Sequence, residues 1–183
     1  MPMTEAPAFP TADQNKIDPA VQNKIDPAGI EIRALRVGDD ATAFRTLNEE
    51  WITTHFVLEP KDRETLEDPE NAVLRKGGEV FTAYIRGQAV GCVALIPMGE
   101  GRYELSKMAV SPALRGHGIG RVLIEHVIAQ ARLIGAESLF LGSNSKLPAA
   151  VRLYESVGFQ HVSPERLPPM HYARADVFME MPL

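Results

Sequence analysis

The stretch around which the rest of the chain is organised reads Met108-Ala109-Val110-Ser111-Pro112-Ala113-Leu114-Arg115-Gly116-His117-Gly118-Ile119-Gly120-Arg121. An apolar run ends at Val110, Pro112 interrupts it, and three glycines at alternating positions lead into a helix expected to begin near Gly118. Glycine lets the backbone turn and pass close to a ligand where a side chain would clash. The start of a helix offers free N–H groups and the positive end of the helix dipole, and both favour an anion. The stretch therefore predicts a site for an anionic, phosphorylated ligand.

Two common glycine-rich loops do not fit these residues. A P-loop ends in Gly-Lys-Ser/Thr, whereas this loop ends in Gly120-Arg121-Val122. A dinucleotide fingerprint needs G-x-G-x-x-G, but its third glycine position falls on Arg121 and the extra glycine comes one residue early. The form Arg-Gly-x-Gly-x-Gly, directly after Met-Ala-Val, instead resembles the GNAT superfamily of N-acetyltransferases, in which this loop binds the pyrophosphate of acetyl-coenzyme A.

A second motif supports this resemblance. Residues 150–159 read AVRLYESVGF and are similar to the A-x-x-L-Y-E-x-x-G-F helix of the same family. The two motifs stand in the expected order, with one strand between them. The resemblance covers residues 29–183 and implies an α/β (α+β) fold of GNAT type: a mixed, mostly antiparallel sheet of about seven strands with helices on both faces.

The order of patterns along the chain agrees with that architecture. Ile30, Ile32 and Leu35 mark a first strand, and Gly38 ends it. Further strands are predicted at residues 80–85, 89–96, 103–110, 138–141, 159–162 and 176–181. Helices are predicted at residues 39–55, 59–71, 118–135 and 148–157, with Pro69 ending the second of them.

Residues 1–28 differ from the rest of the chain. They contain five prolines, and the sequence QNKIDPA occurs twice, at residues 14–20 and 22–28. A short duplication of this composition buries little apolar surface and has no continuous helix or strand period. We therefore expect a flexible leader at residues 1–28 and one N-acetyltransferase domain at residues 29–183.

Composition limits the class of protein. The 183 residues carry a formal net charge of −5 and no basic stripe, so no nucleic-acid partner is expected. The apolar runs are too short to span a membrane and no secretory signal is readable, so we expect a cytoplasmic protein without a membrane partner. The single cysteine, Cys92, lies in an apolar run and is expected to be a small buried side chain. No HExxH motif or Cys/His cluster is present, so no metal is expected.

The resemblance also implies which residues bind acetyl-CoA as a co-substrate. The pantetheine arm is expected to pair, like an added strand, with the backbone of Met108, Ala109 and Val110. The pyrophosphate is expected on the glycine loop, where two arginines could add charge-assisted bonds. The loop residues concerned are Leu114, Arg115, Gly116, His117, Gly118, Ile119, Gly120 and Arg121.

One position departs from the family pattern. The coenzyme-binding asparagine of the family stands three residues before the helix alanine, where this chain has Leu147. Asn144 lies three residues earlier still. Either Asn144 makes that contact from a longer loop, or the contact is absent.

Acetyl transfer to an amine is helped by a base that takes the amine proton and by an acid that protonates the leaving thiolate. In the family, the tyrosine of the second motif points at the coenzyme sulfur, so Tyr154 is predicted to be the acid; the alternative is an ordinary aromatic on the apolar helix face. Glu104 is the candidate base, as in the histone-acetylating branch of the family, or else a polar lining residue. Strand alternation is expected to place Glu104 on one face with Ser106 and Met108.

These features predict an N-acetyltransferase that moves an acetyl group to the primary amine of a small molecule, an amino acid or metabolite, by direct attack in a ternary complex. The alternatives are acetylation of a protein lysine or N-terminus, and a non-catalytic coenzyme-A-binding sensor. Trp51 and His55 are expected near the acceptor cleft, bounded by residues 59–71 and 164–174. An open groove there favours a peptide, and a closed pocket favours a small amine. By analogy with the family, a homodimer is an open alternative to a monomer.

Overall fold

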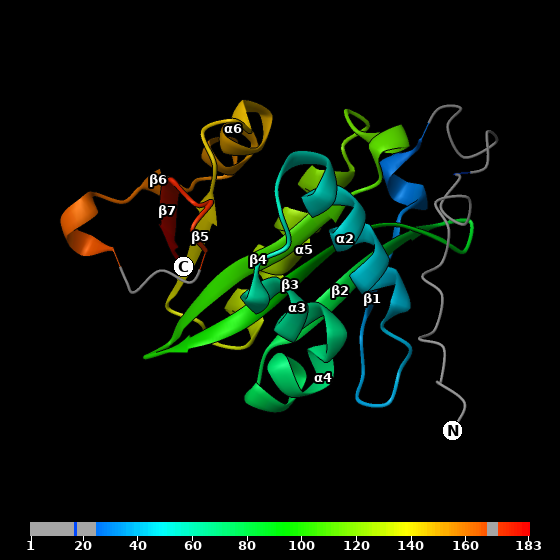
Figure 1. Ribbon diagram of the computed structural model, residues 1–183, viewed down its shortest axis with the longest axis horizontal. Coiled ribbons are helices and arrows are strands. Elements are labelled where there is room, and N and C mark those ends of the chain that lie inside the picture. Colours follow the sequence, from blue (N-terminus) through cyan, green and yellow to red (C-terminus); the bar gives the residue numbers. More distant parts are fainter. Residues whose placement is uncertain (1–16, 18–24, 168–171) are drawn as a thin grey trace, which may run out of the picture.

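The fold is one mixed sheet of seven strands with helices on both faces (Figure 1). The computed structural model describes Ile17, residues 25–167 and residues 172–183. The strands follow the order β1-β2-β3-β4-β5-β7-β6, and every neighbouring pair is antiparallel except β4 and β5, which are parallel. Their bounds are β1 (Glu31–Ala34), β2 (Glu79–Ile85), β3 (Gln88–Gly99), β4 (Arg102–Val110), β5 (Ser138–Ser143), β6 (Gln160–His161) and β7 (Val177–Pro182). The predicted mixed, mostly antiparallel sheet is confirmed.

Helices cover both faces of this sheet. Their bounds are α2 (Thr42–His55), α3 (Pro60–Glu67), α4 (Pro69–Ala72), α5 (Ile119–Leu133) and α6 (Pro148–Ser156). In Figure 1, α2 and α3 lie in front of the sheet and α5 lies behind it. Each face has its own core: the α5-side cluster includes Leu123 and Val127, and the α2-side cluster includes Phe44 and Leu47.

Strand β3 shows how one strand serves both cores. Val93 and Leu95 belong to the α5-side cluster, whereas Cys92 and Ala94 belong to the α2-side cluster. All four side chains are fully buried, which explains why this strand reads as a continuous apolar run. Cys92 is buried as predicted, and burial raises the pKa of its thiol to about 12.

One predicted helix is two helices in the structure. We expected a single helix at residues 59–71 that ends at Pro69, but Pro69 begins α4 instead. Proline suits this place because it occupies the first turn, where a backbone N–H has no helical partner. Asp68 caps the new helix by accepting a hydrogen bond from the Asn71 backbone N–H.

Strand β4 contains a β-bulge that changes which side chains share a face. Two steps along β3, from Cys92 to Ala94, correspond to three steps along β4, from Ala109 back to Ser106. Lys107 takes up the extra residue in the left-handed region, with φ of 52°. Met108 consequently packs against the α5-side cluster, as Leu105 does. The predicted common face for Glu104, Ser106 and Met108 is therefore wrong for Met108, because the bulge shifts the alternation by one residue.

The ladder between strands β4 and β5 ends three residues before the bulge at Lys107. Their parallel ladder runs from Arg102↔Ser138 to Glu104↔Phe140 and goes no further among the described residues, although β4 continues to Val110. Beyond this point β5 pairs with β7. The edge of β4 that follows Glu104 thus faces an opening in the sheet.

The leader is described only in part. Ile17 is buried in the α5-side cluster, and Ile25 packs against the same cluster; these are the isoleucines of the two QNKIDPA copies. Most of residues 1–28 lie outside the described residues, and the predicted boundary at residue 28 stays a prediction. In the described part of the chain, no helix combines the length and apolar character that crossing a bilayer requires.

Candidate active site

A groove of about 550 Å³ runs from the end of β4, past the glycine loop, to α6. Most of its lining comes from the glycine-rich stretch at residues 108–121 and from the start of the second motif. The lining residues are 108–110, 114–116, 118–121 and 146–150, with Leu153, Tyr154, Trp51 and His55. The structure thus brings both sequence motifs to one surface.

The glycine loop presents its backbone to this groove. Gly116 and Gly118 have φ of 81° and 83°, in the left-handed region that side chains rarely adopt. Gly118 is the N-cap of α5 and provides no side-chain cap, so the first N–H groups of α5 have no side-chain acceptor there. A Cβ on Gly120 would lie 3.3 Å from both Leu153 and Met108, so glycine permits α5, α6 and β4 to meet closely. These donors and this closeness suit an anionic ligand lying along the loop.

The three cationic or titratable side chains of the loop, Arg115, His117 and Arg121, have different surroundings. Arg121 donates to Ser156 Oγ at 2.8 Å and lies 3.4 Å from Glu125, so it links α5 to α6. The ring of His117 lies 3.1 Å from the carbonyl oxygen of Arg115 and is exposed, and His117 is absent from the groove lining. Arg115 lines the groove. The roles of these residues in coenzyme binding stay predictions.

A second, smaller pocket of about 90 Å³ adjoins the groove. Five residues line both cavities: Trp51, Met108, Leu147, Ala150 and Tyr154. The remaining walls come from α2, from β4 at Glu104 to Lys107, from the end of β5, and from Tyr172, Arg174 and Ala175. His55 lines only the larger groove, whereas Trp51 lines both cavities, and their predicted place near the acceptor cleft stays a prediction.

Tyr154 lies where the two cavities meet. Burial raises the pKa of its phenol to about 12, which keeps the hydroxyl protonated at neutral pH. Its ring packs edge-on against Phe159, with 6.1 Å between the centroids. A partly buried, protonated hydroxyl at the junction is suited to give a proton to a leaving group there.

Glu104 lines the smaller pocket at the point where the β4–β5 ladder ends. Burial raises the pKa of the Tyr172 phenol, and the negative charge of Glu104 raises it further. The carboxylate of Glu104 and the phenol of Tyr172, which line the same pocket, are therefore electrostatically coupled.

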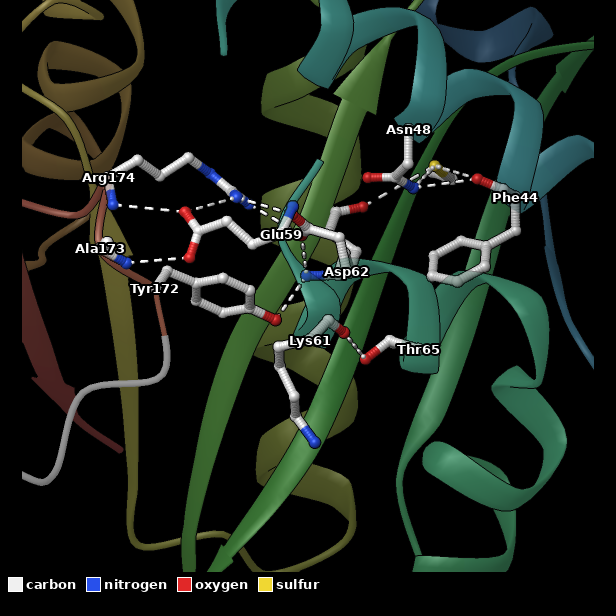
Figure 2. A network of polar contacts seen from close by, with 11 residues as sticks. Phe44, Asn48, Glu59, Lys61, Asp62, Thr65, Tyr172, Ala173 and Arg174 are labelled. Carbon is white, nitrogen blue, oxygen red and sulfur yellow. Dashed lines mark hydrogen bonds and ion pairs between the residues drawn. The ribbon is translucent and has the colours of Figure 1, made fainter. Parts of the chain in front are cut away.

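A buried charge cluster that was not predicted from the sequence lies beside this pocket (Figure 2). Lys107 Nζ lies 2.9 Å from Asp62 Oδ1, with 2% and 0% of their side chains exposed. Arg174 donates to both oxygens of Asp62, at 2.6 and 2.8 Å, in the forked geometry typical of guanidinium and carboxylate. One signal was available: Lys107 interrupts an apolar strand, and a lysine buried in a sheet needs an anionic partner.

Within this cluster the partners of Asp62 outweigh the cost of its burial, whereas for Lys107 burial outweighs the attraction of Asp62. Burial alone would raise the pKa of Asp62, but hydrogen bonds from Arg174 and the charge of Lys107 lower it to about 2. Burial lowers the pKa of Lys107, and the charge of Asp62 acts in the opposite direction. Asp62 is thus held as a carboxylate at every physiological pH.

Asn144 lines the smaller pocket, not the groove. Its Nδ2 donates to the carbonyl oxygen of Arg174 at 2.5 Å, and its Oδ1 accepts from the Lys146 backbone N–H at 2.8 Å. The side chain therefore fixes the loop that precedes α6. Its predicted contact with the coenzyme stays a prediction, and Leu147 and Lys146 line the groove in its place. Among the described residues, no group of three or more His, Cys, Asp or Glu is arranged to hold a metal ion.

Comparison with known proteins places this geometry in context. Residues 43–159 match the model of the acetyltransferase (GNAT) family. An uncharacterized N-acetyltransferase of Schizosaccharomyces pombe is 29% identical over 158 residues, which cover 82% of this chain and 96% of the relative. The N-acetylaspartate synthetase of Xenopus tropicalis is 36% identical over 107 residues, which cover 57% of this chain and 40% of that longer protein.

The fold is also similar to that of a solved structure with a bound coenzyme. The PaiA N-acetyltransferase of Thermoplasma acidophilum, in complex with coenzyme A, superposes with a TM-score of 0.66. The match covers 84% of this chain and 99% of the other at 18% identity, so the likeness is one of fold.

Proposed function

The chain belongs to the acetyltransferase (GNAT) family, and on this premise we propose that it transfers the acetyl group of acetyl-CoA to the primary amine of a small molecule, an amino acid or metabolite. The family match makes the protein an acyltransferase. Acetyl-CoA is the donor that the family uses. The identity of the acceptor is the part that the proposal adds.

The groove supports the placement of the donor. Backbone donors at the start of α5 suit the pyrophosphate, and the edge of β4 beyond Glu104 can pair with the pantetheine arm. A chain lying along this edge reaches the smaller pocket at Tyr154, where the two cavities meet. The thioester would then lie between the hydroxyl of Tyr154 and an amine held beside Glu104.

The reaction on these residues is a direct transfer. The amine nitrogen attacks the thioester carbonyl carbon, a C–N bond forms, and the C–S bond breaks. Glu104 takes the proton that the amine loses, directly or through water, and Tyr154 gives its proton to the leaving sulfur. Alkyl amines have a pKa of about 10 and thiols of about 8.5. A base that takes the amine proton and an acid that protonates the thiolate therefore each speed the transfer, by roughly 10²- to 10⁴-fold.

The single observation that favours a small acceptor is the smaller pocket. Its volume is about 90 Å³, and residues of α2, β4, β5, α6 and the segment at Tyr172–Arg174 line it. A peptide would need an open groove across this surface. The N-acetylaspartate synthetase relative is named for a small-molecule product, which agrees with this choice, although the chain covers only 40% of that protein.

Thiol release from acetyl-CoA tests the proposal. The purified protein is assayed with primary amines, amino acids and peptides that carry the same amine, and mass spectrometry identifies the acetylated product. We expect kcat/KM for the best small amine to exceed that for the matched peptide by about tenfold or more. Transfer only to peptides would overturn the small-molecule acceptor. Binding of acetyl-CoA without transfer to any amine would indicate a coenzyme-binding sensor instead.

A further inference from the structure

One wall of the smaller pocket is a short segment near the C-terminus, residues 172–176, here called the C-terminal strap. Tyr172, Arg174 and Ala175 line the smaller pocket. The groove lining contains no described residue of the strap. The strap therefore belongs to the acceptor side of the site alone.

The first anchor of the strap is the start of α3. Glu59 accepts hydrogen bonds from the backbone N–H groups of Ala173 and Arg174, at 2.9 and 3.3 Å. The guanidinium of Arg174 lies 3.1 Å from Glu59 and 2.6 Å from Asp62 (Figure 2). Glu59 and Asp62 are themselves fixed, because they form the capping box of α3. The anchor is thus held by a helix end and not by a free side chain.

The second anchor is the loop between β5 and α6. Asn144 Nδ2 donates to the carbonyl oxygen of Arg174 at 2.5 Å. Two residues further on, Asp176 accepts from the Ser145 backbone N–H and from its hydroxyl, both at 2.7 Å. This loop leads directly into α6, which carries Tyr154. Arg174 consequently connects α3, through its side chain, to the entrance of α6, through its carbonyl.

The third contact fixes the aromatic part of the wall. Lys107 Nζ lies 4.2 Å from the centroid of the Tyr172 ring, and Arg174 Cζ lies 4.7 Å from it. Lys107 also donates to the Tyr172 hydroxyl at 2.5 Å. Two cations packed on one ring set its orientation, so a change at Arg174 is transmitted to the surface that faces the acceptor.

We propose that Arg174 is a positioning residue for the acceptor: it holds the C-terminal strap, and with it the Tyr172 ring, as the wall that sets the acceptor in line with Glu104 and Tyr154. The inference rests on the proposed function, because it assigns the smaller pocket to the acceptor. It goes further in naming a residue that acts on one substrate and not on the other. A purely structural residue would affect both substrates alike.

Steady-state kinetics of Arg174→Met test this assignment. We expect the KM of the acceptor to rise about tenfold or more, as the loss of a positioning contact worth about 1.4 kcal/mol would give, while the KM of acetyl-CoA changes less than about twofold. Arg174→Lys keeps the charge but not the forked geometry, so it should restore only part of the acceptor KM. Arg33→Met is the matched control, because Arg33 lies in the edge strand β1, pairs with Glu31 at 2.7 Å and lines neither cavity.

A milder variant guards against loss of the fold. Arg174→Met leaves the buried Asp62 with one cation, whereas Glu59→Gln weakens the same anchor at a partly exposed carboxylate and should shift the acceptor KM in the same direction. Equal shifts in the two KM values, or no shift in a folded variant, would overturn the inference while the proposed function stands. If the wild-type protein acetylates no amine at all, the proposed function fails first and the inference fails with it.

Discussion

The larger groove and the smaller pocket meet at Tyr154, yet different kinds of residue line them. Two continuous stretches provide most of the groove lining, as glycines and apolar side chains together with Arg115, Arg121 and Lys146. The pocket is bordered by charged groups, and its ion-pair partners Asp62, Lys107 and Arg174 come from α3, β4 and the C-terminal strap. Backbone donors can bind one invariant ligand in every member of a family, whereas side chains gathered from distant segments can change with each acceptor. On the proposed function, the groove takes the acetyl donor and the pocket selects the acceptor.

Gly118→Val gives the largest expected effect on the groove. Gly118 has φ of 83° and open space around it, so valine would strain the backbone without a steric clash, at a cost of about 1–3 kcal/mol. Relaxing that strain turns the N–H groups at the start of α5 away from the groove. We expect calorimetry to detect no acetyl-CoA binding by a variant that stays folded, with a melting temperature lowered by about 2–12 °C.

Gly38→Val is the matched control for this test. Gly38 has φ of 88°, its Cβ position is also open, and it lies in the loop after β1, outside both cavities. This control should carry a similar strain yet bind acetyl-CoA normally. Normal binding by Gly118→Val would show that the groove does not depend on the loop backbone.

Tyr154→Phe tests the junction of the two regions. Removing the hydroxyl should lower kcat by about 10²-fold or more, because the leaving thiolate loses its acid, while acetyl-CoA affinity is nearly unchanged. Tyr84→Phe serves as control, since Tyr84 lies in β2 under Arg33 and lines neither cavity. An unchanged kcat would remove Tyr154 from the role of acid and would leave the groove and pocket without a shared catalytic group.

The smallest expected effect concerns the free energy of unfolding at low pH, to which the charge cluster beside the pocket contributes. The pKa of Asp62 is lowered from 3.8 to about 2 in the folded protein. A lowered pKa contributes stability that is complete above about pH 4 and is lost as the pH falls towards 2, by roughly 2–3 kcal/mol in total. Urea unfolding of the wild type should show this loss between pH 4 and pH 2, and Asp62→Asn should lack that part of the slope.

Glu67→Gln provides the comparison for the acid range, because Glu67 is an exposed carboxylate on the same helix as Asp62. Its pH profile should follow that of the wild type. If Asp62→Asn keeps the full wild-type slope between pH 4 and pH 2, the buried cluster is not what couples stability to protonation in this range.

The two regions also differ in how far sequence reasoning reaches. The strands, α2, α5 and α6 follow from apolar periodicity, and the groove follows from residues that are neighbours in the chain. The cluster does not, because Lys107 and Arg174 lie 45 and 112 residues from Asp62 and meet it only through the fold. No local pattern records a partner at that separation.

Two local details were also beyond the sequence. The bulge at Lys107 puts a residue other than glycine at positive φ, a conformation that costs energy locally and is imposed by the neighbouring strand and by Asp62. A regular alternation of side chains along β4 ignores this bulge, and the prediction therefore put Met108 on the wrong face of the sheet. His55 lies one helical turn after Trp51, but spacing alone does not say that Trp51 lines both cavities and His55 only the groove.

The burial of Cys92 has a practical consequence for measuring the reaction. It is the single cysteine of the chain, its side chain is inaccessible, and its thiol has a pKa of about 12. A colourimetric thiol reagent reacts with thiolate, so in the folded protein it would report only the coenzyme set free at each turnover. Without substrate, the same reagent would measure how fast the core opens. Labelling of Cys92 requires the α2-side cluster to open first, so its rate reports that opening.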